Sequence, residues 1–248
     1  MRHSLPRILQ IFYWSTFDLF IWGVITKYLG GIGGEKFGFL TILIGAIILW
    51  NFFTRVMAGI TVSFLEDIWS RNFINLFTSP LSIGEYIAGL TLVSAMNTFL
   101  SITVMSALAW FFMSYNIFQF DFYLLPFIFT LFISGWSLGI IATSTILYFG
   151  PAVEIFVWTL PTFIMPFAGV FYPVEALPEI FQPIARLLPI SYVFEGMRQV
   201  VNGGVFDVNI FIYALVLSLI YFLAAIAILY KVYGAVLRLG LFTRFIAE

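Results

Sequence analysis

Long runs of apolar residues, interrupted by glycine, proline and charged residues, dominate the pattern of this chain. Six of these runs are long enough to cross the roughly 30 Å hydrocarbon core of a bilayer as helices, which takes about 20 residues. Most of the breaks contain glycine or proline, because glycine is too flexible for a helix and proline lacks a backbone N–H. The six expected spans lie at about residues 11–29, 37–62, 86–113, 122–149, 152–172 and 209–232.

The composition identifies the class of protein. Hydrophobic residues make up 62% of the 248 residues and charged residues only 9%, whereas soluble domains contain roughly 45–50% apolar and about 25% charged residues. So few charged residues cannot cover the surface of a soluble globular protein of this size. A chain this rich in apolar residues is also unlike a disordered one. The net charge of −1 argues against nucleic acid as a partner. We expect an all-α membrane protein in which residues 1–248 form a single transmembrane domain.

The first apolar run is interpreted as an uncleaved span rather than a signal peptide. It contains Trp14, Asp18 and Trp22 and lacks a small-residue cleavage site. With the N-terminal segment in the cytoplasm, seven Lys and Arg residues lie on the inner side and four on the outer side, as the positive-inside rule favours. Both termini are then cytoplasmic, and the protein lies in the plasma membrane, which is the inner membrane in a prokaryote.

Residues suited to catalysis or metal binding are scarce. The chain has no cysteine, one histidine (His3) and no Gly-Lys pair of the kind that a phosphate-binding loop requires. An intramembrane hydrolase needs a nucleophile with a base, or paired carboxylates, and Asp18 and Glu154 are the only acids expected within spans. We therefore expect no enzymatic activity, no metal site and no cofactor in this chain.

The segment between spans two and three has helical periodicity. Apolar residues at 65, 68, 69, 73, 76 and 77 form one face, and charged residues take the other. The pattern fits an interfacial helix lying on the membrane and a helix presented to a cytoplasmic partner equally well. Pro80 ends this helix, and Ser82 with Glu85 forms a capping box at the start of span three.

A second unusual segment, residues 173–205, lies between spans five and six. It is too apolar for a free loop and too rich in proline for a span. Short outer helices that re-enter the membrane, with their backbone shielded by protein, fit it best.

Three motifs in order resemble the membrane subunits of ATP-binding-cassette (ABC) exporters of the type-two export family. The first is Glu66…Arg71…Ser79-Pro80-Leu81-Ser82…Glu85, and the second is Gly169-Val170-Phe171-Tyr172-Pro173…Leu177-Pro178. The third is Leu188-Pro189-Ile190-Ser191-Tyr192 followed by Glu195-Gly196-Met197-Arg198. With six spans, the resemblance covers nearly the whole chain.

The resemblance implies a permease in which two six-span subunits, expected to form a homodimer, pair with two cytoplasmic ABC ATPase subunits that bind ATP and Mg. It implies that residues 66–79 are a coupling helix that docks on the ATPase, and that the short outer helices close the export path. Glu154 has two interpretations: an acid favoured by the dipole of a helix that starts near Pro151, or a second ATPase contact. The coupling residues are then Glu66, Asp67, Trp69, Arg71, Phe73, Ser79, Pro80 and Glu154, and the outer gate is Phe171, Tyr172, Pro173, Glu195 and Arg198.

Asp18 and Arg55 are expected at similar depths in spans one and two. Charges within a bilayer are costly and usually find a partner, so we predict an ion pair between them. The alternative is that Arg55 reaches the inner headgroups while Asp18 faces a wet cavity. Gly135 and Gly139 have the spacing of closely packed helices, and we expect them to pack within the subunit.

The aromatic composition bears on the class of cargo. Aromatic residues make up 20% of the chain, and a passage rich in Phe favours an amphipathic, lipid-like or drug-like substrate. Export of a lipid-linked polysaccharide is the alternative. A secondary transporter or channel would need internal repeats or polar residues lining a path, and the sequence has no such repeat. Membrane lipids are the remaining expected partners.

Overall fold

The computed structural model describes residues 13, 16–28, 37–70, 80–203 and 207–241. Every element in these ranges is a helix. The elements are a helical segment at 16–28, α2 (Phe37–Trp69), α4 (Ile83–Met113), η1 (Ile117–Tyr123), α5 (Leu124–Phe149), η2 (Pro151–Val153), α6 (Ile155–Ile164), η3 (Val174–Ala176), α7 (Gln182–Leu187), α8 (Pro189–Val201) and α9 (Val208–Leu239).

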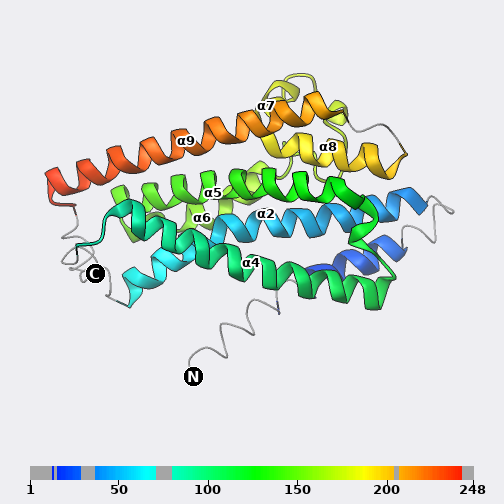
Figure 1. The fold of residues 1–248 in the computed structure, drawn as a ribbon, viewed down its shortest axis with the longest axis horizontal. Helices are drawn as coiled ribbons and strands as arrows, with labels where there is room; N and C mark the ends of the chain where they lie inside the picture. The colour runs from blue at the N-terminus through cyan, green and yellow to red at the C-terminus, as the bar shows by residue number, and fades with distance from the viewer. Residues whose placement is uncertain (1–12, 14–15, 29–36, 71–79, 204–206, 242–248) are drawn as a thin grey trace.

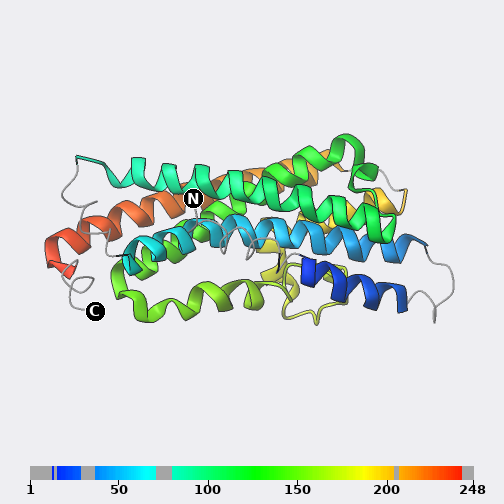
Figure 2. The same ribbon diagram turned by 90° about the horizontal axis from the view of Figure 1, so that it is seen from below.

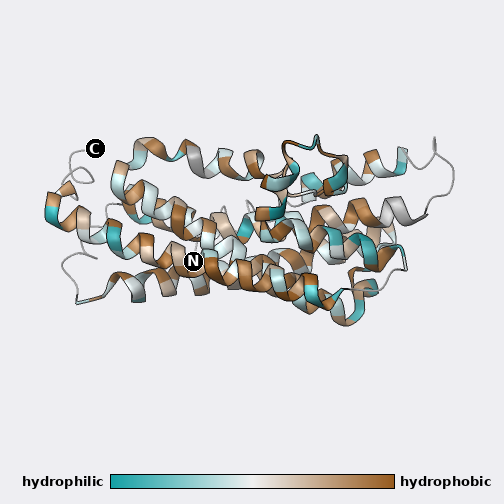
Figure 3. Cartoon of the chain, turned by 90° about the horizontal axis from the view of Figure 1, so that it is seen from above, coloured by the Kyte–Doolittle hydropathy of each residue, from teal (hydrophilic) through white to brown (hydrophobic). Residues whose placement is uncertain are grey.

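Four long helices, α2, α4, α5 and α9, form an elongated bundle (Figure 1). Helix α5 packs against both α2 and α9, and α4 packs on α2. At one end of the bundle α2, α5 and α9 finish and α4 begins; we call it the Trp69 end after the last residue of α2. Helices α7 and α8 lie toward the opposite end, the α8 end. Hydrophilic residues gather near the two ends and around α7 and α8, whereas the long helices are mainly apolar (Figure 3).

The helix ends follow from local chemistry. Helix α4 starts with the predicted capping box, which is confirmed: the Ser82 hydroxyl accepts from the backbone of Glu85, and the Glu85 carboxylate accepts from the Ser82 backbone. Asp207 caps α9 by accepting from the backbone N–H groups of the second and third residues that follow it. Gly240 ends α9 in the left-handed conformation, with φ of 64°.

Four helices within the described residues are long and apolar enough to span a membrane: Ile42–Trp69, Ile83–Met113, Ile117–Phe149 and Val208–Leu239. They correspond to expected spans two, three, four and six. The described part of expected span one is helical over 16–28. In expected span five the α-helix covers only the ten residues of α6, about 15 Å at 1.5 Å per residue, and the 3-10 turn η2 precedes it. Proline at 161 and 166 removes backbone donors there, and turns replace the helix after Ile164.

Helix α2 is longer than predicted, because it continues past Val62 to Trp69. The expectation of a separate helix starting at Glu66 is therefore wrong for residues 66–69, which form the last turn of α2. The cause is burial: Phe64, Leu65 and Ile68 pack into a core cluster with residues of α4, α5 and α9. Residues 71–79, the rest of the predicted coupling helix, lie outside the described residues.

Small and hydroxyl-bearing residues bring the long helices close together. A Cβ atom at Gly135 would lie 2.8 Å from a Val56 methyl, and one at Gly139 would lie 2.7 Å from the Met57 carbonyl oxygen. The prediction that these glycines pack within the subunit is confirmed, since their neighbours are on α2. Between α5 and α9, the buried hydroxyls of Ser134 and Ser218 are hydrogen-bonded at 3.0 Å. Close packing and hydrogen bonds of this kind stabilise helix association in a membrane, where the hydrophobic effect does not drive helices together.

Candidate functional sites at the two ends of the bundle

The last turn of α2 carries the first predicted coupling residues. Glu66 and Asp67 are half-buried, and the Trp69 side chain is 56% exposed. Pro80 is exposed, just before the cap of α4. Arg71, Phe73 and Ser79 lie outside the described residues.

Residues 65, 68 and 69 are the described part of the apolar face between expected spans two and three, and two of them are buried within this chain. Leu65 is fully buried and Ile68 is 7% exposed, both in the cluster of α2, α4, α5 and α9. These two side chains are therefore unavailable for docking, because a buried side chain cannot enter a groove on a partner. Helical periodicity marks an apolar face but does not say which surface covers it. Trp69 is the described member of that face that stays exposed.

Tyr86 is a residue of this end that the sequence did not single out. Its hydroxyl donates a 2.7 Å hydrogen bond to the Asp67 carboxylate and so joins the first turn of α4 to the last turn of α2. The ring of Tyr86 lies 6.2 Å from that of Phe64, also on α2. The sequence did contain a signal for this contact. Tyr86 follows closely after the Ser82 cap of one helix, and the acid Asp67 lies near the end of the helix before it.

Glu154 begins α6 without capping it. Its backbone is the N-cap of the helix, and its side chain makes no capping hydrogen bond. Its N–H bonds to the Pro151 carbonyl at 2.9 Å, within the 3-10 turn that starts at that proline. The half-buried side chain stays a predicted ATPase contact.

At the α8 end, Arg198 and Glu195 hold the chain segment after α6. The two side chains form an ion pair with a distance of 2.9 Å, and Arg198 is only 8% exposed. Arg198 also donates to the carbonyl oxygens of Gly169 and Val170 at 2.7 and 3.5 Å, and Glu195 accepts from the Val174 N–H at 2.8 Å. One charged pair on α8 therefore ties down residues 169–174, and we call these contacts the α8 clamp.

Gly169 makes the α8 clamp possible. Its φ is 63°, in the left-handed region that favours glycine. A Cβ atom there would also lie 3.2 Å from the Tyr172 carbonyl oxygen and 3.4 Å from the Arg198 guanidinium. The sequence motif contained this glycine, but only the structure explains it.

The other predicted gate residues lie in the clamped segment. The Phe171 ring stacks on Trp22 of the 16–28 helix, with centroids 4.6 Å apart. The Tyr172 hydroxyl donates to the Pro166 carbonyl at 2.8 Å, and Pro173 precedes η3. The structure thus brings together all five residues predicted for the gate, on α8 and on the segment that α8 holds.

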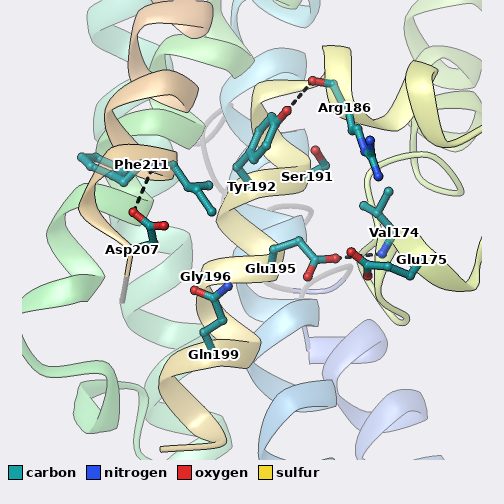
Figure 4. A pocket seen from close by; sticks show the side chains of 11 residues that line it. Val174, Glu175, Arg186, Ser191, Tyr192, Glu195, Gly196, Gln199, Asp207 and Phe211 are labelled. Atoms are coloured by element: carbon teal, nitrogen blue, oxygen red, sulfur yellow. Dashed lines mark hydrogen bonds between the residues drawn. The ribbon is translucent and has the colours of Figure 1, made fainter. Parts of the chain in front are cut away.

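A cavity of about 180 Å³ lies beside the α8 clamp, between α8, the start of α9 and the segment after α6. Its lining includes the carboxylates of Glu175, Glu195 and Asp207 and the side chain of Arg186 (Figure 4). Tyr192 donates to the Arg186 carbonyl at 2.7 Å. Partial burial, reinforced by nearby Tyr213, raises the pKa of Tyr192, so this phenol stays a neutral donor.

Asp18 of the 16–28 helix lies beside the middle of α2. Its carboxylate lies close enough to the Asn51 side chain and to Arg55 to interact with both, and the Asn51 amide donates to the Ile47 carbonyl at 3.1 Å. The structure thus brings the two predicted partners into one region and adds Asn51, which the sequence analysis missed. Asn51 lies one helical turn before Arg55, so the spacing on α2 was the available signal.

Comparison with known proteins bears on these sites. Residues 4–202 match the family model described as ABC-2 type transporter. A comparison with curated proteins finds no match.

Proposed function

Because the chain belongs to the ABC-2 type transporter family, and is therefore a membrane permease of an ABC transporter, we propose that it is the permease subunit of an ATP-driven exporter. Two copies form the translocation path, and each engages one separate ATPase subunit. The chain itself hydrolyses no ATP, and ATP and Mg are bound by the partner. The observation that carries this proposal is the family match over residues 4–202.

The proposed topology has six spans with both termini in the cytoplasm. The short 16–28 and α6 helices then belong to spans one and five, beside the four long helices. They lie along the same side of the bundle, opposite α4 (Figure 2). The Trp69 end faces the cytoplasm, in agreement with the Lys and Arg distribution of the sequence.

The same side of the bundle supports the proposed homodimer and the class of cargo. Large apolar side chains on both short helices are exposed, among them Phe17, Phe20, Trp158 and Phe163. A second copy set against this side would face them across the path. A path lined by these side chains gives apolar contacts to its cargo and few polar ones. This favours an amphipathic, lipid-like or drug-like substrate over a lipid-linked polysaccharide.

Reconstitution tests the proposal. The tagged chain is purified with the phosphate-loop protein that accompanies it, and the complex is inserted into vesicles loaded with a fluorescent amphiphile or with a labelled lipid-linked oligosaccharide. We expect ATP-dependent movement of the amphiphile and cargo-stimulated ATP hydrolysis. Movement by the permease alone, driven by an ion gradient, would contradict the ABC assignment of function, and movement of only the oligosaccharide would overturn the cargo class.

A further inference from the structure

We propose that Tyr86 is a positioning residue for coupling, and that its hydrogen bond to Asp67 makes the end of α2 and the start of α4 move as one unit. This inference rests on the proposed function, because it concerns how work from the ATPase reaches the spans. The two helices are consecutive long spans of this chain, and the predicted coupling residues lie on and between them.

The bond between the two residues is short and partly shielded. The distance from the Tyr86 hydroxyl to the Asp67 Oδ2 atom is 2.7 Å, and both side chains are half-buried. A hydrogen bond to an ionised acceptor is shorter and stronger than a neutral one. It is also less weakened by water when the groups are partly withdrawn from solvent.

A cap and buried packing hold the helix turns that carry the bond. The Ser82 backbone N–H donates to the Glu85 carboxylate at 2.9 Å, which fixes where α4 begins. On either side of Tyr86, Ile83 and Ile87 are buried in the same cluster as Phe64 of α2. A displacement applied to one helix end is therefore passed to the other rather than absorbed by a loose turn.

A third helix touches the same turn. The Tyr230 hydroxyl of α9 lies over Gly84, so close that a Cβ atom there would be 2.5 Å from it. The start of α4 thus lies between α2 and α9. The Tyr230 side chain is 53% exposed and can turn aside, so this contact adds a neighbour at the start of α4 without fixing it.

The first test separates coupling from simple folding. Tyr86→Phe keeps the ring against Phe64 and removes only the hydroxyl. In vesicles containing the complete complex, we expect ATPase binding to persist and the amount of ATP hydrolysed per cargo molecule to rise about three- to tenfold. Asp67→Asn keeps an acceptor oxygen for the tyrosine but loses the charge, so it should lie between wild type and Tyr86→Phe, whereas Asp67→Leu should resemble Tyr86→Phe.

Tyr148→Phe is the matched control. Tyr148 lies near the Trp69 end, at the end of α5, and its side chain is 36% exposed. Loss of its hydroxyl should leave the ratio of ATP to cargo unchanged. An unchanged ratio in Tyr86→Phe, in a complex whose wild type transports with ATP, would overturn the inference alone; transport without any ATPase would overturn the proposed function as well.

A covalent link gives a test that does not depend on the stability of Tyr86→Phe. The chain has no cysteine, so Asp67→Cys with Tyr86→Cys can be joined selectively by a short bifunctional maleimide. We expect the cross-linked complex to keep ATP-dependent transport and to use less ATP per cargo than the same variant without the linker. Loss of transport on cross-linking would show that the two helix ends must separate, and would overturn the inference.

Discussion

The two ends of the bundle each use a carboxylate to join two parts of the chain, but the partners differ. At the α8 end, Glu195 shares its charge with a buried arginine, and that arginine also binds two backbone carbonyls. At the Trp69 end, Asp67 accepts from the neutral hydroxyl of Tyr86. The α8 clamp fixes an irregular segment whose backbone needs partners, whereas the Asp67–Tyr86 bond joins two helices that already satisfy their own backbone.

This difference indicates that the α8 clamp and the Asp67–Tyr86 bond have different roles. An irregular backbone near the membrane is stable only where protein satisfies its polar groups, so the α8 clamp has to stay intact for the segment to fold. Two long helices would fold without a side-chain bond between their ends, so the bond at the Trp69 end is available for transmitting motion. Substitutions at the α8 end should therefore affect stability most, and those at the Trp69 end should affect coupling most.

The largest expected effect is that of Arg198→Ala. The change leaves the Glu195 carboxylate in a partly buried site without its cation and removes donors from two carbonyls. Breaking a buried ion pair in this way typically costs about 3–5 kcal/mol. We expect poor recovery of the folded protein and a strongly lowered melting temperature in detergent. Arg186→Ala, at an exposed side chain nearby, should change stability by less than about 0.5 kcal/mol; equal effects of the two would contradict the special role of the α8 clamp.

A smaller loss is expected at the contact of the 16–28 helix with α2. Asp18→Asn and Arg55→Gln should each lower stability or transport, and the double variant should lose less than the sum. Coupling energies of about 0.5–3 kcal/mol are typical for interacting charges. A double-mutant cycle on melting and transport measures this, with Lys27→Gln, an exposed change on the same helix, as the control. If the losses of the two single variants add up exactly in the double variant, Asp18 and Arg55 do not interact, and Asn51 is then the partner of Asp18.

Gly169→Ala should have a comparable or slightly smaller effect. A residue with a side chain costs about 1–2 kcal/mol in the left-handed conformation, and the new methyl would press on the Tyr172 carbonyl. Gly89→Ala is the control, since a Cβ at Gly89 meets no atom within 4 Å and alanine favours a helix. We expect the first variant to melt earlier and the second to melt at the same temperature or later. The reverse order would mean that the turn at Gly169 is not required for the α8 clamp.

The features that the sequence predicted correctly are local ones. The Ser82–Glu85 capping box depends on residues three positions apart, and Gly135 and Gly139, one turn apart on α5, mark a close approach although their neighbours lie on α2. The partners that were missed, Tyr86 for Asp67 and Asn51 for Asp18, lie on different helices. Their contact depends on how those helices are rotated about their axes, and hydrophobic periodicity does not fix that rotation within a chain that is apolar on every side.

The end of α2 shows the same limit in another form. Residues 65, 68 and 69 have the i, i+3, i+4 spacing of a docking face, yet Leu65 and Ile68 are covered by α4, α5 and α9. The same apolar spacing therefore includes two side chains of the core, Leu65 and Ile68, and one exposed side chain, Trp69. A single sequence cannot distinguish the two, because burial inside a subunit and burial against a partner select the same side chains.

The smallest effect on stability, and a large one on assembly, is expected for Trp69→Ala combined with Arg71→Ala. Trp69 is 56% exposed at the end of α2, so its removal opens no cavity in the core. Trp and Arg residues that become buried in an interface often dominate its binding energy, and this end of the bundle is the one proposed to meet the ATPase. We expect an unchanged melting temperature of the permease alone, with weaker ATPase association and slower transport, measured by pull-down of the purified ATPase and by vesicle assays.

Trp158→Ala, an exposed tryptophan on α6, is the control for loss of a surface indole and should leave ATPase association intact. If the double variant binds the ATPase normally, the interfacial-helix interpretation of this segment is the correct one, and the docking surface has to lie elsewhere on the Trp69 end.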